Sequence, residues 1–143
     1  MSLTFSKKKK KKKMINKFFL YDNLIQKAEI YYKRRKYHLA LDIVNEAISL
    51  ELPLSKQKKV EAYELRGNIK TKLSYYLDSI NDFNKAIRLD SKNASLFFYR
   101  GMALCVLDDK DGALNDFNQL IKFEPNNKSA LEMSQYLRDS LED

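Results

Sequence analysis

Apolar residues recur along most of the chain at steps of three and four, the spacing of one face of an α-helix. Within residues 79–90, for example, Ile80, Phe83 and Ile87 follow this spacing. The 143 residues include only three Gly and two Pro, which are the residues that most often interrupt regular structure. The pattern therefore predicts long helices joined by short turns.

The chain also matches itself at an offset of 34 residues. Residues 79–90 align with 113–124, and Gly67 aligns with Gly101; a weaker copy at residues 40–51 precedes the second by 39. A glycine inside a helix costs about 1 kcal/mol relative to alanine. Its presence at the same place in two copies indicates close packing of helices. A fixed period of this size is typical of repeat proteins, in which each unit buries its apolar face against its neighbours.

The residues at fixed places in each copy resemble those of the tetratricopeptide repeat family: an aromatic residue, then Gly, Ala, Phe, Ala and Pro. In the third copy these places hold Phe97, Gly101, Ala113, Phe117, Leu120 and Pro125. In the second copy they hold Tyr63, Gly67, Ser79, Phe83, Ala86 and Ser91. In the first copy they hold Leu24, Ala28, Ala40, Val44, Ala47 and Leu52.

The resemblance implies an all-α fold of stacked antiparallel helix hairpins, an α-solenoid with about three repeats and a C-terminal capping helix. We expect one repeat domain over residues 14–143, preceded by a disordered, Lys-rich tail at residues 1–13. The predicted repeats and capping helix lie at about 21–54, 60–93, 94–127 and 128–142.

The net charge of +8 is concentrated at one end of the chain. Residues 1–36 hold 13 Lys and Arg against two acidic residues, a net charge of +11, so the remainder carries −3. Lys7 to Lys13 are seven consecutive like charges, which repel one another and predict disorder. The run has three functional interpretations: a nuclear address, an RNA-binding arm or a contact with an anionic membrane. The alternative is a low-complexity extension without a role, with Met14 as the true start.

The residue content argues against several classes of protein. Cys105 and His38 are the only cysteine and histidine, so we expect no disulfide, no metal site and no cofactor. No Gly-rich phosphate loop or nucleophile–base set is visible, which predicts that the protein is not an enzyme. Without a long apolar run or a signal peptide, we expect an intracellular protein, cytoplasmic rather than nuclear.

In the family that the sequence resembles, the first helices of the repeats line a concave groove in which ligands usually lie. Projected onto this sequence, the candidate partner-binding residues are Asn68, Phe98, Tyr99, Met102 and Cys105. Tyrosine is common at binding hot spots, and methionine adapts to irregular surfaces. The alternative is that the last helix covers Phe98, Tyr99 and Met102 as ordinary core.

One subgroup of the family binds acidic C-terminal tails of chaperones through a clamp of Lys, Asn and Arg side chains. The matching positions here hold Ile25, Glu29, Leu65, Ser95 and Tyr99. None of these supplies the cation or amide that a doubly charged terminus requires. A standard chaperone tail is therefore not the expected partner.

The leading hypothesis is a protein-interaction module, an adaptor or scaffold that holds a peptide or helical segment of a partner. Arg66 and Arg100 occupy equivalent places in two repeats, which indicates a structural role in pairing with neighbouring acids. The second hypothesis is a nucleic-acid or anionic-surface binder that uses the basic end, with only weak nucleic-acid binding through Lys7 to Lys13. Self-association through exposed apolar residues is a further alternative.

Overall fold

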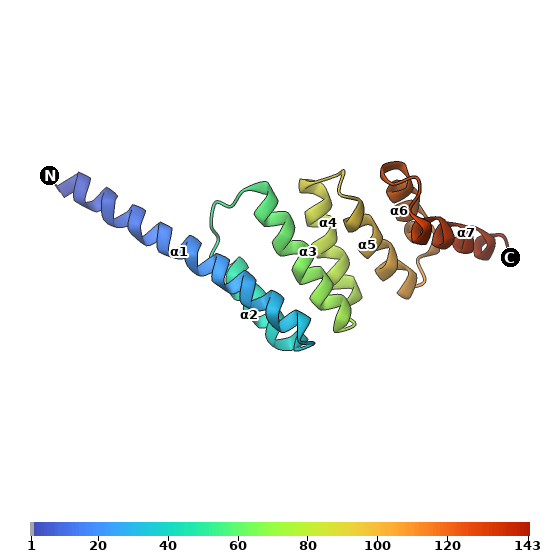
Figure 1. Cartoon of the computed structure of the whole chain (residues 1–143), viewed down its shortest axis with the longest axis horizontal. Helices are drawn as coiled ribbons and strands as arrows, with labels where there is room; N and C mark the ends of the chain where they lie inside the picture. The colour runs from blue at the N-terminus through green and yellow to red at the C-terminus, as the bar shows by residue number, and fades with distance from the viewer. Residues whose placement is uncertain (1) are drawn as a thin grey trace. The chain divides into compact units, whose positions relative to one another are not determined.

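The computed structural model describes residues 2–143. These residues form seven helices and no strand, as the helical periodicity of the sequence predicts. Contacts divide the chain into two compact units, the first ending at Leu54 and the second spanning Ser55–Asp143. The predicted all-α, α-solenoid fold is confirmed: three antiparallel hairpins are followed by a single helix. Figure 1 shows the helices in chain order.

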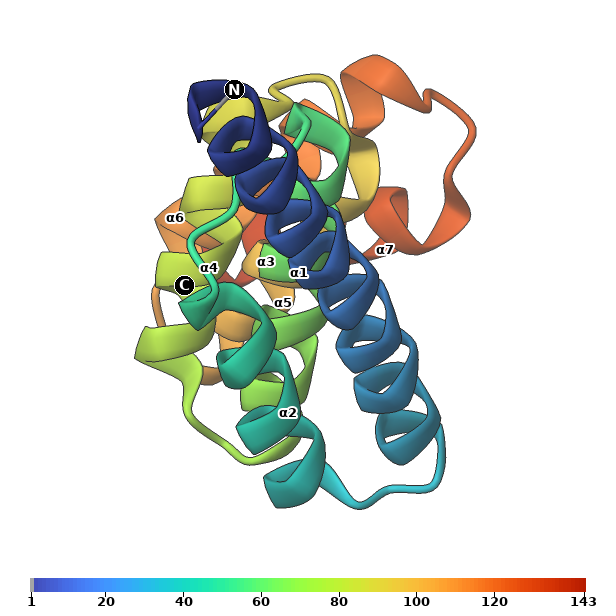
Figure 2. The ribbon, with the colours of Figure 1, turned by 90° about the vertical axis from the view of Figure 1, so that its left-hand side faces the viewer.

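The first unit is one hairpin, formed by α1 (Ser2–Lys33) and α2 (Tyr37–Ser49). The two helices contact each other and run antiparallel (Figures 1 and 2). At 1.5 Å per residue, α1 is roughly 48 Å long and α2 roughly 20 Å. The buried residues of α1 are accordingly confined to its C-terminal part: Tyr21, Leu24 and Ala28.

Residues 2–13 are helical, which differs from the disordered tail that the sequence predicts. They continue α1 without a break, although all of their side chains are exposed. Lysine has a good helix propensity, and no Gly or Pro interrupts residues 2–33. The expectation of disorder was based on charge repulsion, which weakens a helix by only a few tenths of a kcal/mol for each like-charged pair.

The second unit contains two hairpins and the final helix. Its elements are α3 (Lys56–Lys72), α4 (Tyr76–Leu89), α5 (Ala94–Val106), α6 (Lys110–Phe123) and α7 (Lys128–Glu142). Each helix contacts the next along the chain, and α3 also contacts α5. Helix α7 packs on α6 and buries Ala130 and Leu137 in the same cluster as Phe117. The last helix therefore caps the stack, as predicted.

The turns inside the three hairpins share one backbone feature. Arg35, Ser74 and Asp108 stand at equivalent places after the first helix of each hairpin, and all three have positive φ, at 60°, 64° and 60°. Helices commonly end on a residue in this left-handed conformation. The N-terminus of α7 is capped by Asn127, whose side chain accepts a hydrogen bond from the backbone N–H of Ala130.

Gly67 and Gly101 let the two helices of their hairpins approach closely, which confirms the packing role predicted for them. A Cβ added to Gly67 would lie 2.7 Å from Cε1 of Phe83, whereas one added to Gly101 would lie 3.2 Å from Phe117. Both phenylalanine rings are fully buried. The contact at Gly67 is the tighter of the two.

Gly67→Ala is therefore expected to lower the free energy of unfolding by about 1–2 kcal/mol. Overpacking costs about 1–3 kcal/mol, and the gain of about 1 kcal/mol in helix propensity offsets part of it. Gly101→Ala is the matched control and should cost less. Urea unfolding of both variants measures the difference, and equal stability of the two would contradict the packing argument.

Candidate functional site

Two arginine–aspartate pairs join the helices of the second and third hairpins. Arg66 donates to both carboxylate oxygens of Asp82, at 2.9 Å from Nε and 2.7 Å from Nη2. Arg100 contacts Asp116 in the same way, at 2.8 and 2.6 Å. Each aspartate side chain is 1% exposed. This geometry agrees with the structural role predicted for both arginines.

Arg100 also connects its hairpin to the preceding one, a contact that the sequence analysis missed. Its Nη1 donates to Oδ1 of Asn84 on α4 at 2.8 Å. One repeat later, Oγ of Ser134 on α7 donates to Oδ1 of Asn118 on α6 at 3.0 Å. Asn84 and Asn118 are 34 residues apart, so the repeat period places them at equivalent positions and could have indicated their shared role. Arg100 thus makes three hydrogen bonds to side chains of α4 and α6.

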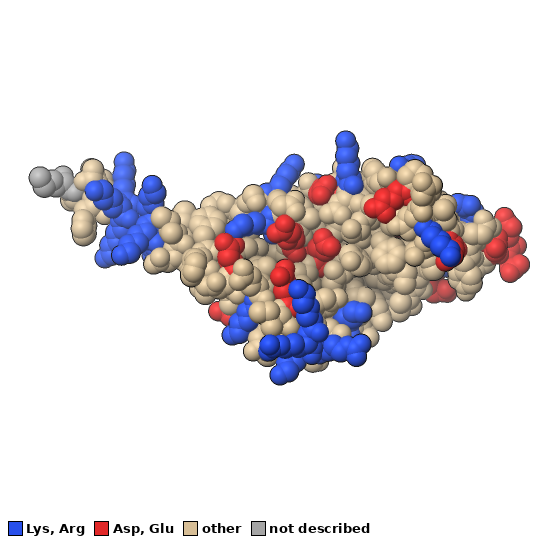
Figure 3. Space-filling model, viewed as in Figure 1, with Lys and Arg blue, Asp and Glu red and all other residues tan. Residues whose placement is uncertain are grey.

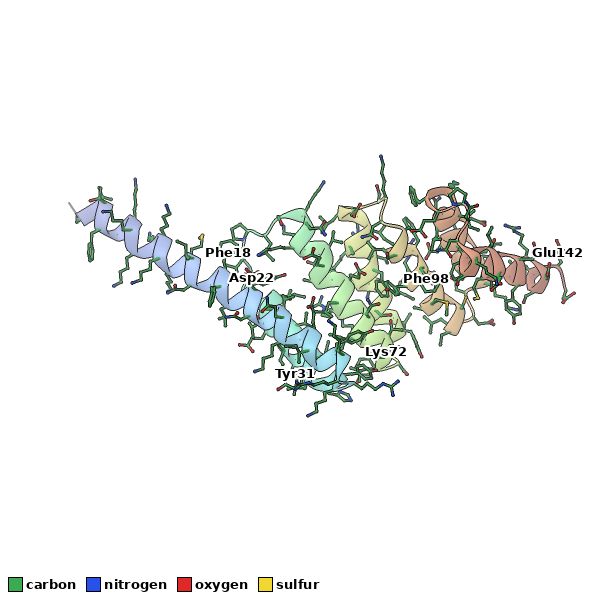
Figure 4. The ribbon with its side chains drawn as sticks, viewed as in Figure 1. Phe18, Asp22, Tyr31, Lys72, Phe98 and Glu142 are labelled. Atoms are coloured by element: carbon green, nitrogen blue, oxygen red, sulfur yellow. The ribbon has the colours of Figure 1, made fainter. Side chains whose placement is uncertain are left out.

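A pocket of about 220 Å³ opens beside the first turns of α5 and α7. Its lining residues are Ala94, Ser95, Phe98, Tyr99, Leu120, Glu124, Asn127 and Ser129. The ring of Phe98, labelled in Figure 4, meets those of Tyr99 and Phe117 edge-on, with centroids 5.9 and 6.1 Å apart. Tyr99 also stacks on Phe83 at 6.0 Å. The aromatic wall of the pocket is thus fixed from behind by the core.

The five predicted partner-binding residues separate into two groups. Phe98 and Tyr99 line the pocket, whereas Asn68, Met102 and Cys105 are not part of its lining. Met102 is 38% exposed, and Asn68 is half-buried on α3.

The alternative interpretation, that these residues are core, holds for some of them. Phe98 packs against the cluster that includes Ala130 and Leu137 of α7, whereas Tyr99 packs against the separate cluster of Val60, Phe83, Ala86 and Leu96. Met102, in contrast, keeps a substantial exposed surface.

Cys105 is partly buried on α5. Burial raises the pKa of the Cys105 thiol, so the protonated, weakly nucleophilic form prevails at neutral pH. Residues 2–143 contain no group of three or more His, Cys, Asp and Glu side chains arranged to hold a metal ion. In the same residues, no helix is both long and apolar enough to cross a bilayer.

The polar part of the pocket is neutral or acidic. Glu124 accepts a hydrogen bond from the amide of Asn127 at 2.7 Å, and Ser95 and Ser129 contribute hydroxyl groups. No Lys or Arg belongs to the lining. The pocket therefore lacks the positive charge that a terminal carboxylate requires.

Glu64 on α3 is half-buried, and its pKa is raised above the ordinary 4.5 by this burial and, to a smaller degree, by the charge of Glu61. The folded protein therefore binds a proton at Glu64 more tightly than the unfolded chain does. The stability that this proton linkage contributes is fully present below pH 4.5 and is lost as pH rises through the folded pKa.

Glu64→Gln should accordingly raise the free energy of unfolding near neutral pH and flatten its decline just above pH 4.5. Urea unfolding of parent and variant across pH 4–7 tests this, with the exposed Glu142→Gln as the control. A variant with the same pH profile as the parent would show that Glu64 titrates equally in both states.

Comparison with known proteins gives relatives that are built from the same kind of helix hairpin. No family model matches the chain. The peptidyl-prolyl cis-trans isomerase FKBP4 of Rattus norvegicus is 31% identical over 115 residues, which cover 73% of this chain and 25% of that protein. This chain thus spans about a quarter of the length of that relative.

Two solved structures extend the comparison. The Arabidopsis OM64 TPR domain has a TM-score of 0.74 and 26% identity, with 83% of this chain and 94% of that chain covered. The first TPR of Spaghetti (RPAP3), bound to the HSP90 peptide SRMEEVD, has a TM-score of 0.76 and 22% identity over 86% of this chain and 94% of that chain.

The fold and these comparisons define an α-helical repeat protein built of tetratricopeptide-type hairpins. More particularly, the chain has the fold of a tetratricopeptide repeat domain, which its 34-residue period indicated.

Proposed function

We propose that this domain binds a peptide or helical segment of a partner protein at the pocket between α5 and α7. The observation that carries the proposal is the aromatic wall of Phe98 and Tyr99, which faces an open pocket while the core fixes both rings. A preorganised aromatic surface loses little entropy when a ligand binds, which favours affinity. The comparisons support this class of function, because the RPAP3 domain was solved with a bound peptide.

The preferred segment differs from the peptide in that structure. The HSP90 peptide SRMEEVD ends in acidic residues and a carboxylate. In this chain, the polar part of the pocket consists of Glu124, Asn127 and two serine hydroxyls, and its lining contains no Lys or Arg. We therefore propose a neutral or basic segment with an apolar or aromatic anchor as the ligand. A domain that binds such segments of partner proteins acts as an adaptor. This function requires no catalysis.

The test is a display library of random peptides selected on the full chain, followed by affinity measurements on pocket-filling variants. Ser95→Trp and Ser129→Trp add bulk to the pocket at residues whose side chains are exposed, so the core is undisturbed. We expect selected peptides to bind each variant at least about tenfold more weakly, a loss of about 1.4 kcal/mol. Asn115→Trp, on an exposed position of α6 outside the pocket, is the control.

The peptide SRMEEVD serves as a second probe, expected to bind the parent more weakly than the selected peptides. Selected peptides that bind the parent and both pocket-filling variants equally would refute the proposed site. Preference for SRMEEVD would refute the proposed ligand chemistry while leaving the site in place.

A further inference from the structure

The N-terminal part of α1 is an exposed helix that carries one sign of charge. Every side chain from Ser2 to Lys17 is exposed, and no acidic residue occurs before Asp22. Figure 3 shows Lys side chains gathered around this stretch. The lysines at 7–13 occupy all sides of the helix, because seven successive residues span nearly two turns. The stretch therefore attracts polyanions from every direction.

The same stretch exposes several large apolar side chains, and three of them share one face. Leu3 and Met14, 76% and 49% exposed, lie on the opposite side of the helix. Phe5, Lys8, Lys12, Ile15 and Phe19 follow one another at steps of three and four, so they lie along one face of α1. Phe5, Ile15 and Phe19 are 73%, 57% and 69% exposed. The buried face of α1 is a different one and consists of Tyr21, Leu24 and Ala28.

Apolar side chains at both ends of a lysine cluster suit the boundary between lipid headgroups and acyl chains. There, aromatic and aliphatic side chains leave water while lysine ammonium groups reach the phosphates along their flexible stems. A nucleic acid would neutralise the lysines equally well, but it offers no apolar layer for an isoleucine. The apolar face therefore favours a lipid surface over a nucleic acid.

We propose that residues 2–20 of α1 bind the surface of an anionic lipid membrane, with Phe5, Ile15 and Phe19 in the interfacial layer and the lysines on the headgroups. The helix lies along the surface, because lysines on all sides oppose its burial in hydrocarbon. Neutralisation by the lipids also removes the repulsion among neighbouring lysines, so the bound helix is more stable than the free one. This binding is independent of the function proposed for the pocket.

The test measures flotation of the full chain with vesicles of phosphatidylcholine alone and of phosphatidylcholine with 30% phosphatidylserine, a composition chosen at roughly the anionic content of a charged leaflet. We expect binding to the anionic vesicles only, weakening as salt is added. The chain has no Trp, so Phe19→Trp introduces a single reporter. Its fluorescence should shift to the blue with anionic vesicles if the side chain leaves water.

Two variants separate charge from apolar contact. Neutralising Lys8, Lys9, Lys11 and Lys12 to Gln should weaken binding at least about 100-fold, since each lysine near an anionic surface contributes roughly fivefold. The matched control neutralises four exposed lysines of the second unit and should bind as the parent does: Lys56, Lys59, Lys72 and Lys92.

Replacing Phe5, Ile15 and Phe19 by Ser should weaken binding about tenfold or more at unchanged charge. Leu77→Ser, at a position 70% exposed in the second unit, is the control. Equal binding to both kinds of vesicle would overturn the proposal. So would an unshifted Trp emission together with full binding by the serine variant, and so would binding to single-stranded RNA without any flotation on anionic vesicles.

Discussion

Phe117→Ala is expected to lower the free energy of unfolding by about 3–5 kcal/mol, which is the usual cost of truncating a buried phenylalanine. The ring is 0% exposed and lies in the cluster that joins α5, α6 and α7. Its loss removes contacts with Phe98 and opens a cavity next to Gly101. Because domains of this size are stable by only about 5–15 kcal/mol, the variant should be close to unfolding.

Chemical denaturation followed by circular dichroism measures this change. Phe5→Ala is the matched control, since its ring is 73% exposed, and a surface substitution of this kind usually changes stability by less than about 0.5 kcal/mol. If Phe117→Ala and Phe5→Ala unfold at the same denaturant concentration, Phe117 does not support the core as described.

Asp116→Ala should cost about 3 kcal/mol, at the lower end of the range for removing one partner of a buried ion pair. Asp116 is 1% exposed and accepts two hydrogen bonds from Arg100, whose own side chain is 21% exposed. Removing the carboxylate leaves a guanidinium that keeps only Asn84 and partial contact with water. Because the side chain of Arg100 keeps contact with water, the loss of free energy of unfolding should lie at the lower end of this range.

The first repeat supplies a natural comparison for this pair. At the places equivalent to Arg100 and Asp116 it has Lys27, which is exposed, and Ile43, which is 6% exposed. An apolar residue can therefore replace the acid when the arginine is also absent. The double variant Arg100→Lys, Asp116→Ile should be closer to the parent in urea unfolding than Asp116→Ala. A double variant as unstable as Asp116→Ala would show that isoleucine cannot replace the aspartate even when the arginine is absent.

Much of the fold followed from local pattern. The 34-residue period located the hairpins, and the glycines at 67 and 101 indicated close packing of the helices within them. The resemblance to the repeat family implied the capping helix. The run of like charges predicted disorder for residues 2–13, whereas these residues are helical, because the helix propensity of lysine offsets the repulsion between neighbours.

The candidate site was only partly predictable. Projection of the family pattern selected residues on the first helices, and two of them, Phe98 and Tyr99, line the pocket. Glu124, Asn127 and Ser129, which also line the pocket, were not predicted. These three come from a helix end and a turn, whose places beside α5 depend on how α7 packs on α6.

The sequence by itself determined the repeat, its helices and the pairing of Arg66 and Arg100 with acids, because these depend on periodicity and on contacts between residues at fixed separations. Only the tertiary structure decided which side of α5 is open. Phe98 is half-buried against the core and Met102 remains 38% exposed, although both residues have helical, apolar spacing. Periodicity defines the face of a helix, but exposure depends on which neighbouring helix covers that face.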